Sequence, residues 1–434
     1  MRLRVANHKE LHRALRYRAD VGALLITNAR IATLARAGCD GKPRRGAALC
    51  DLGIIERGWV RTRDARIESI GAGDGPMPMA GERVIDAHGR LVTPGFVDCH
   101  THACYEGERI DEWEMKLAGK PYLEILAAGG GIMASVRATR AASTEVLADG
   151  VLRRTREMAA YGTTTVEVKS GYGLDTSTEL RMLEAIARAG TASPLRIVPT
   201  FLGAHAKDPE QSDFVERTIG ETLPRVAQAH PGITCDAYCE EGAWSVDECV
   251  RYFERGRALG LAVRVHTDQF HSLGMIERAV ALGARSVDHL EAATREDLSR
   301  VARSETIVVG LPAASFCLST PCVRARELID EGGALALATN ANPGSAPVRS
   351  MSIIHAFAVR EMRLVPAEAI ACTTWNAACV LGLASECGSL EPGKSADLVL
   401  WEHRDERALG YELTGSLPLL VVARGAAVAS EMRA

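Results

Sequence analysis

The chain has 434 residues, of which 47% are hydrophobic, so it can build a full core and is neither disordered nor fibrous. Its 51 basic and 55 acidic residues give a formal charge of −4, which does not favour a nucleic-acid or membrane-surface binder. No apolar run is long enough to span a bilayer, and the charged N-terminus lacks the apolar core of a secretory signal. We therefore expect a cytoplasmic globular protein.

The two ends of the chain have a similar character. Residues 1–20 are predicted to form a polar helical extension, because their few apolar side chains stand among many charges. From residue 21 the segments become short and rich in β-branched residues, and they are separated by Gly, Pro and Asp. Segments of the same kind return after residue 388. We predict one small β-sandwich-like domain built from both termini, residues 21–93 and 388–434, around a central insertion.

The central residues 94–387 alternate short apolar runs with helical stretches, which predicts an α/β protein. Eight apolar runs spread over about 290 residues have the size and rhythm of a (β/α)8 TIM barrel. Several runs end in His, Asp, Glu or Asn, and the chemistry of such barrels lies at the C-terminal ends of the strands. The runs are GFVDCHTH, TTTVEVKSG, LRIVPTFLGAH, TCDAYCEEG, LAVRVHTD, ARSVDHLE, TIVVGLP and ALALATNANPG.

Four histidines lie at the ends of three of these runs. His100 and His102 are two residues apart, so their side chains leave the same side of a strand and can converge on one ion. His266 and His289 each end a later run. One such histidine alone is most often an ordinary polar residue, but four together favour a site for zinc or iron. The twelve cysteines are dispersed, and we interpret them as buried free thiols.

Longer strings, in this order and spacing, carry a resemblance to a known family: PGFVDCHTH, EWEMKLAGKPYLEILAAGGGI, RATRAAS, TTTVEVKSGYGL, TFLGAHA, CEEG, VDHLEAAT and NPGSAP. From about Pro94 to Trp401 the chain resembles the imidazolonepropionase family of the amidohydrolase superfamily. The first 20 residues fall outside the resemblance. It implies that a metal-activated water hydrolyses the cyclic amide of 4-imidazolone-5-propanoate, giving N-formimidoyl-L-glutamate in histidine degradation.

The family pattern implies roles for single residues. One zinc or iron ion per subunit would be held by His100, His102 and His266 together with residue 340. His289 resembles the residue that orients or polarises groups around the attacked carbonyl, and Gln269 would face the ring. Lys169 is expected to be a structural or pocket cation, because the family resembles the one-metal branch of the superfamily. The residues implied in substrate binding are Arg109, Tyr122, Tyr172, His205, Gln269, Asn342, Gly344 and Ser345.

Asn340 departs from the family pattern. In the string ALATNANPGSAP the family carries an Asp that binds the metal and takes the proton of the attacking water. A neutral amide offers one oxygen to a cation but is no general base at neutral pH. The predicted catalytic set is therefore His289, Gln269 and Asn340, acting on a small-molecule substrate.

Three alternatives stay open: a hydrolase with a shifted base, a slow enzyme or one acting on a related cyclic amide, and a non-catalytic relative that binds a small carboxylate. The sequence does not decide between zinc and iron, and it leaves the oligomeric state open, a homodimer being one possibility.

Overall fold

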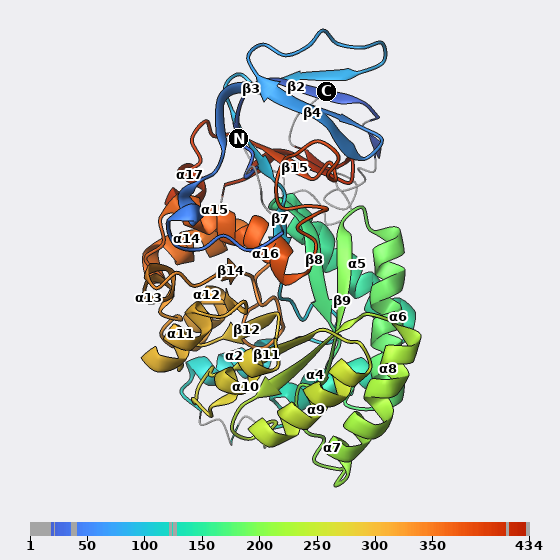
Figure 1. Cartoon of the computed structure of the whole chain (residues 1–434). Coiled ribbons are helices and arrows are strands. Elements are labelled where there is room, and N and C mark those ends of the chain that lie inside the picture. The colour runs from blue at the N-terminus through green and yellow to red at the C-terminus, as the bar shows by residue number, and fades with distance from the viewer. Residues whose placement is uncertain are drawn as a thin grey trace.

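The computed structural model describes residues 19–20, 22–35, 41–120, 124, 128–413 and 416–430. These residues form two β-sheets and a set of helices. Figure 1 shows one sheet at the top of the molecule and the second sheet below it, surrounded by helices. The predicted N-terminal extension lies almost wholly outside the described residues. Within the described part of the chain, no helix combines the length and the apolar character needed to cross a membrane.

The lower sheet is a parallel barrel whose eight strands follow one another in sequence order. Most of their residues are buried, as expected of parallel strands covered on both faces. Beyond the strand ends, Asn340 N–H donates to His100 O and His102 N–H to Ala341 O, both at 3.0 Å, so the last strand meets the first. The predicted (β/α)8 barrel is confirmed. Its strands are β7 (Phe96–Asp98), β8 (Thr163–Lys169), β9 (Arg196–Ala204), β10 (Thr234–Cys239), β11 (Val263–Thr267), β12 (Ser286–His289), β13 (Ile307–Gly310) and β14 (Leu335–Leu337).

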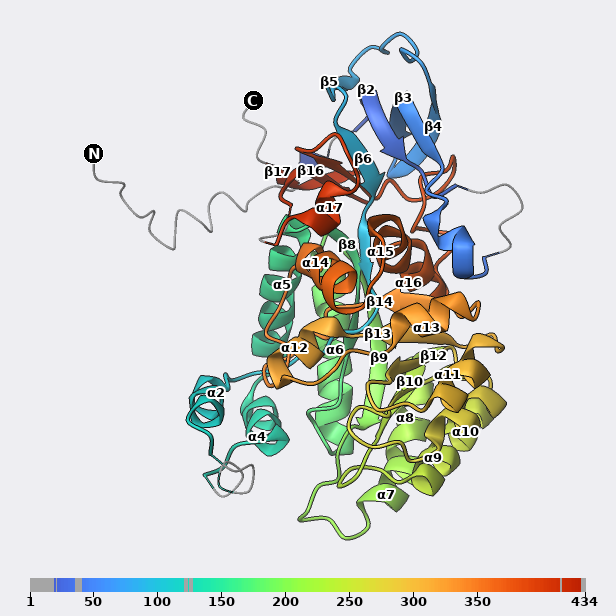
Figure 2. The same ribbon diagram turned by 90° about the vertical axis from the view of Figure 1, so that its left-hand side faces the viewer.

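Helices connect these strands and cover the outside of the barrel (Figure 2). The long connection from β7 to β8 carries α2, α4 and α5, and its first two helices project from the side of the barrel. The helices are η1 (Gly46–Cys50), α2 (Ile110–Leu117), α4 (Ile132–Ala141), α5 (Thr144–Ala160), α6 (Thr176–Ala192), α7 (Phe214–Arg217), η2 (Thr218–Thr222), α8 (Leu223–Ala229), α9 (Val246–Ala258), α10 (Met275–Ala281), α11 (Arg295–Ala302), α12 (Pro312–Leu318), α13 (Ala325–Asp330), α14 (Met351–Glu361), α15 (Pro366–Thr373), α16 (Trp375–Val380) and α17 (Ala408–Tyr411).

Local sequence signals explain where several helices begin. The side chains of Ser143, Asp175 and Thr294 each accept a hydrogen bond from a backbone amide three residues further on. Ser245 and Glu248 form a complete capping box at the start of α9. These contacts satisfy backbone donors that the first helical turn leaves unpaired. These contacts fix where the four helices begin, and three of them, α6, α9 and α11, each follow a barrel strand directly.

The upper sheet is built from both ends of the chain. Strand β15 pairs antiparallel with β6, Leu398 lying opposite Pro94, and this pairing joins the two parts. Leu24, Ile26, Val92 and Leu398 are fully buried in its apolar core. In this sheet β15 lies between β6 and β16, and β17 follows β16; Figure 2 shows β16 and β17 in the same part of the molecule as β6. Its nine strands are β1 (Ala19–Asp20), β2 (Leu24–Ala32), β3 (Ile54–Arg63), β4 (Arg66–Ala72), β5 (Arg83–Asp86), β6 (Leu91–Pro94), β15 (Leu398–Trp401), β16 (Pro418–Ala423) and β17 (Ala426–Ser430).

Candidate metal centre and substrate pocket

Four histidines converge at the C-terminal end of the barrel. His100 and His102 follow β7, His266 lies in β11, and His289 ends β12. Ring nitrogens of His100, His266 and His289 lie within 4.8 Å of one another. The Nε2 atom of His102 lies 3.3 Å from Nε2 of His266. All four side chains are buried, so the predicted convergence of imidazoles at the barrel mouth is present.

Two buried carboxylates fix the orientation of two of these rings. Nδ1 of His266 lies 3.0 Å from Asp236 Oδ1, and Nδ1 of His100 lies 2.6 Å from Asp288 Oδ2. An ionised carboxylate only accepts hydrogen bonds, so each Nδ1 is the protonated nitrogen. Each Nε2 therefore carries a lone pair, which is the form of imidazole that binds a metal ion.

Two unsatisfied atoms test whether a metal ion fits this group. Among the described residues, His100 Nε2 and Asn340 Oδ1 are buried and have no hydrogen-bond partner. Leaving a buried polar atom unpaired costs about 1–3 kcal/mol. Asn340 has a left-handed backbone with φ of 54°, a conformation that Asn tolerates. Imidazole nitrogens and an amide oxygen are both known metal donors, so the residues present fit a bound cation.

Burial favours the neutral form of His100, His102 and His205. It lowers the pKa of His100 and of His102 well below the usual 6.5, and neighbouring positive groups lower both further. Burial also lowers the pKa of His205 to about 3. Neutral imidazole is the form that binds a metal ion, so His100 and His102 need not lose a proton to act as ligands near neutral pH.

A group of buried charges lies behind the histidines. Lys169 Nζ lies 2.7 Å from Glu167 Oε1 and 2.9 Å from Asp236 Oδ2. The Arg264 guanidinium pairs with Asp288, and its Nη1 lies 3.6 Å from Glu167 Oε1. The side chains of these five residues are at most 1% exposed. Lys169 is thus a buried cation with two carboxylate partners.

A cavity of about 610 Å³ opens above the histidines. This volume lies within the range of small-molecule sites. His100 is fully buried and lies outside the cavity lining, and Tyr122 falls outside the described residues. The structure brings the other sequence-predicted residues together in the lining: His102, Arg109, Tyr172, His205, His266, Gln269, His289, Asn340, Asn342, Gly344 and Ser345.

Arg109 reaches this cavity from the residue just before α2. Its Nε and Nη2 donate to Glu112 at 2.8 and 2.6 Å, and Lys116 also pairs with Glu112 at 2.7 Å. Burial alone would raise the pKa of Glu112, but these cations lower it to about 2. A Cβ added to Gly344 would lie 2.2 Å from Arg109 Nη1, so only glycine allows this approach. Glu112 thus holds one edge of the guanidinium and leaves Nη1 beside Gly344.

Two aromatic residues form the adjoining wall. The ring of His205 stacks on that of His102, with centroids 5.0 Å apart, and its Nδ1 lies 2.9 Å from Gly171 O. Since a carbonyl only accepts, Nδ1 of His205 donates and Nε2 is an acceptor. Tyr172 is buried against His205, and burial raises the pKa of its hydroxyl, which therefore stays protonated. This wall offers a hydroxyl donor and an imidazole acceptor.

Gln269 lies on the loop between β11 and α10, which is held by Glu240. Glu240 accepts the N–H of Phe270 at 2.9 Å and contacts Nδ1 of His271 at 2.8 Å. The hydroxyl of Tyr238 donates to Gln269 Oε1 at 2.9 Å. The carbonyl end of the Gln269 side chain is therefore engaged, and its amide nitrogen is the atom presented to a ligand.

The loop after β14 is held together by Asn342. Its Oδ1 accepts the N–H groups of Gly344 and Ser345, both at 2.8 Å, and its Nδ2 donates to Asn340 O at 2.7 Å. The two amides are thus used inside the loop. These hydrogen bonds hold the loop, which lines the cavity, against the backbone of Asn340.

His289 also has a carboxylate partner. Its Nδ1 lies 3.2 Å from Glu291 Oε1, which accepts a hydrogen bond from Ser315 at 3.1 Å. The backbone of His289 has a φ of 86°, an uncommon conformation for a residue with a side chain. Such strain persists where the surrounding structure imposes it, often at functional sites.

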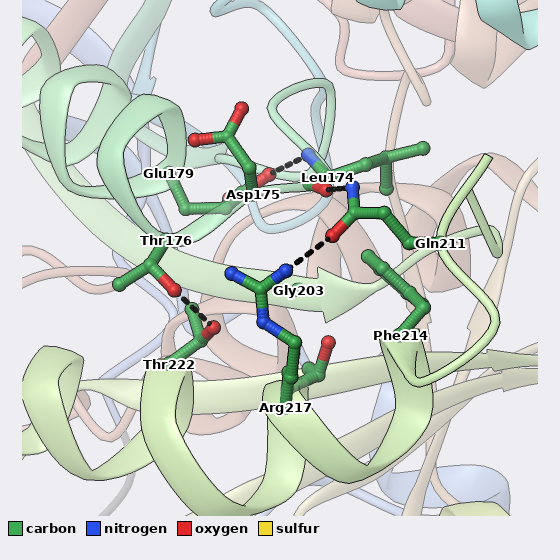
Figure 3. Close-up of a pocket in the computed structure, with 10 residues that line it drawn as sticks. Leu174, Asp175, Thr176, Glu179, Gly203, Gln211, Phe214, Arg217 and Thr222 are labelled. Carbon is green, nitrogen blue, oxygen red and sulfur yellow. Dashed lines mark hydrogen bonds between the residues drawn. The ribbon is translucent and has the colours of Figure 1, made fainter.

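A second, smaller pocket lies beside the start of α6 (Figure 3). Its volume of about 10 Å³ has room for about one water molecule. Its polar groups bond to each other: Gln211 joins Arg217 to Leu174 O, and Thr176 contacts Thr222 at 2.7 Å. This pocket is therefore a packing feature and no substrate site.

Comparison with known proteins agrees with this geometry. The amidohydrolase family model matches residues 91–414. An imidazolonepropionase of Chloroflexus aggregans is 43% identical over 90% of this chain and 95% of that protein. One of Symbiobacterium thermophilum is 42% identical over 95% of this chain and 98% of that protein. The chain belongs to the imidazolonepropionase family of amidohydrolases.

Solved structures share the fold of this imidazolonepropionase-family chain. E. coli guanine deaminase aligns with a TM-score of 0.72 and 15% identity over 94% of this chain and 99% of that one. The 5-methylcytosine deaminase of Klebsiella pneumoniae aligns with a TM-score of 0.71 and 16% identity over the same shares. At these identities the similarity establishes the fold alone.

Sequence reasoning missed the carboxylates behind the site of this family member. Asp236, Asp288 and Glu291 were not predicted, although each lies in or just after a strand that was. A signal was present, because charged residues alternate with apolar ones in VEVK, CDAY, VRVH and SVDH. Residues two apart share one face of a strand, so this alternation places charges inside the barrel.

Proposed function

We propose that this protein hydrolyses the cyclic amide bond of 4-imidazolone-5-propanoate to N-formimidoyl-L-glutamate, a step of histidine degradation. Water supplies a hydroxyl group to the ring carbonyl carbon and a proton to the ring nitrogen as the C–N bond breaks. The observation that carries the proposal is one cavity lined both by three of the four converging histidines and by Arg109. Imidazolonepropionases more than 40% identical over most of their length support the same substrate.

We propose that one zinc or iron ion is held by His100, His102 and His266 with the side-chain oxygen of Asn340. A bound ion supplies Lewis acidity, which polarises the ring carbonyl and makes water more acidic. The donor set supports this assignment, because carboxylates orient two of the rings and an unpartnered oxygen of Asn340 lies beside them.

His289 is the group that we propose to move the proton. Glu291 accepts from Nδ1, which leaves the lone pair on Nε2. Nε2 then takes a proton from water and returns it to the ring nitrogen that leaves, and Glu291 stabilises the imidazolium formed in between. Asn340 takes no part in this transfer because an amide has no basic site at neutral pH.

The remaining side chains orient the substrate. Arg109 is proposed to bind the propanoate carboxylate through Nη1, since Glu112 occupies the other edge of the guanidinium. The Tyr172 hydroxyl and the His205 ring lie on the adjoining wall and contact the same arm or the ring edge. The amide nitrogen of Gln269 donates to an acceptor on the ring. We place the enzyme in the cytoplasm, which suits its many free thiols.

A product assay in labelled water tests the proposal. Protein loaded with zinc or iron is incubated with 4-imidazolone-5-propanoate in H₂¹⁸O, and mass spectrometry follows N-formimidoyl-L-glutamate. One labelled oxygen per product is expected, and the His289→Gln variant should form product far more slowly. His355→Gln changes a buried histidine that does not line the cavity and should keep the activity. Absence of product, or turnover of another cyclic amide in its place, would overturn the proposed substrate.

A further inference from the structure

The donors nearest to the proposed metal ion are all neutral. Three are imidazoles, which bind a metal ion in their neutral form, and the fourth is the amide of Asn340. A divalent ion bound by such a set keeps its full charge in a water-poor site, which is costly unless negative charge lies nearby.

The negative charge nearest to these donors lies one hydrogen bond further out. Asp236 contacts His266 at 3.0 Å and Asp288 contacts His100 at 2.6 Å. Both aspartates are fully buried. A carboxylate that accepts the Nδ1–H of an imidazole makes the opposite nitrogen a stronger donor to a metal ion. The strand register brings both aspartates to the level of the β11 residues Arg264 and His266, since Asp288 on β12 lies opposite His266 and Asp236 on β10 lies opposite Arg264.

The buried charges around these aspartates do not cancel. Glu167, Asp236 and Asp288 contribute three negative charges, whereas Lys169 and Arg264 contribute two positive ones. The cluster therefore has one excess negative charge when all five groups are ionised. The two cations hold the aspartates in place behind the imidazoles, since Lys169 Nζ lies 2.9 Å from Asp236 Oδ2 and Arg264 pairs with Asp288.

We propose that Asp236 and Asp288 are the positioning residues that supply the negative charge for metal binding through His266 and His100, in place of a carboxylate ligand at position 340. The inference rests on the metal-dependent function proposed above. It implies that the metal affinity of this protein depends more strongly on its buried aspartates than on Asn340. It also implies that a carboxylate at position 340 adds to their effect.

Metal affinity, measured without turnover, tests the inference. Metal-free protein is titrated with Co²⁺ in competition with a chelator of known affinity, and the visible Co²⁺ spectrum is recorded. Asp288→Asn and Asp236→Asn should each weaken binding about 10- to 100-fold and shift the spectrum. Asn340→Asp should tighten binding about tenfold or more, and adding it to Asp288→Asn should recover most of the loss.

A matched control makes the same change in a buried aspartate elsewhere. Asp397 lies at the junction with the upper sheet, where it accepts the N–H of Arg424 at 2.7 Å. Asp397→Asn should leave the affinity within about twofold of the parent, since no metal-facing ring contacts that carboxylate. Circular dichroism checks that each variant folds. If neither aspartate variant folds, Asn340→Asp alone decides.

Two results would overturn the inference: parental affinity in folded Asp236→Asn and Asp288→Asn proteins, or no tightening by Asn340→Asp. A parent protein that binds no Co²⁺ would contradict the proposed function and the inference together. Binding with the expected variant pattern but without hydrolysis of 4-imidazolone-5-propanoate would contradict the proposed function alone.

Discussion

The atoms that a side chain of this site can offer to a ligand depend on the hydrogen bonds that the side chain already makes. The Nε and Nη2 atoms of Arg109 donate to Glu112. Arg109 therefore does not present this pair of donors to the cavity. Gln269 presents its amide nitrogen because Tyr238 engages its oxygen. Neither partnership was predictable from the sequence, because both join side chains through loop conformations that no short pattern encodes.

Replacing Arg109 by alanine tests its role in binding the substrate carboxylate. A hydrogen bond to a charged group contributes about 1.5–3 kcal/mol, so KM should rise about 10- to 100-fold while kcat changes little. Steady-state kinetics on 4-imidazolone-5-propanoate measure both constants. Arg153→Ala, on the exposed side of α5, is the control and should change neither. An unchanged KM in Arg109→Ala would remove this residue from the substrate site.

Replacing either member of the His289–Glu291 pair should lower kcat, and the loss should be larger for His289. His289→Gln removes the proposed proton carrier and should lower kcat about 10²- to 10⁴-fold. Glu291→Gln keeps the histidine but removes the charge that stabilises its protonated form, so its loss in kcat should be smaller, about tenfold. Metal content should stay at the parental level in Glu291→Gln. Equal kcat values in the parent and both variants would show that another group moves the proton.

At the scale of helices and strands, the alternation of apolar runs and helical stretches in the sequence predicted the barrel strands. All eight apolar runs are barrel strands, and their order follows the chain. The histidines at their ends converge because parallel strands present their C-terminal ends on one side. The carboxylates behind them were missed because the sequence argument used only the polar residues at the ends of the runs, although the alternation within the runs pointed to the barrel interior.

The buried His355 in α14 should make the stability of the folded protein depend on pH. Its ring packs against Phe96 at the start of β7, its Nε2 lies 2.6 Å from the Thr373 hydroxyl, and burial lowers its pKa from 6.5 to about 3. The unfolded chain takes up a proton below pH 6.5, whereas the folded protein does so only near pH 3. The stability that neutral His355 contributes is therefore full above pH 6.5 and is lost as the pH falls towards 3.

Urea unfolding of the parent and of His355→Gln at pH 7.5 and 5.5 measures this effect. The difference in unfolding free energy between the two proteins should shrink by about 1.4 kcal/mol at the lower pH, because only the parent carries this titrating group. Comparing the two proteins cancels the contributions of the other buried groups. A difference independent of pH would contradict a buried, neutral His355.

At the scale of the whole molecule, the two sheets are built from different parts of the chain. The barrel is continuous in sequence and carries the proposed site, whereas the upper sheet joins both termini through the pairing of β6 with β15. The sequence predicted this arrangement from the recurrence of β-branched segments at both ends. The exact domain boundaries and the role of the first residues stay predictions.

Asn340 stands where the family resemblance implies an aspartate. More than 40% identity to imidazolonepropionases places the chain in its family, yet one neutral amide changes the charge balance of the proposed metal site. The structure offers buried aspartates behind the imidazoles and a His289–Glu291 pair. With these two features, the proposed hydrolysis does not need a carboxylate ligand at position 340.

The most direct test of the account is a metal titration of activity. Metal-free protein receives increasing amounts of zinc or iron, and the rate of N-formimidoyl-L-glutamate formation is measured at each step. The account predicts a negligible rate without metal, a linear rise, and a plateau at about one ion per chain. Full activity in metal-free protein, or no activity at any metal content, would contradict it.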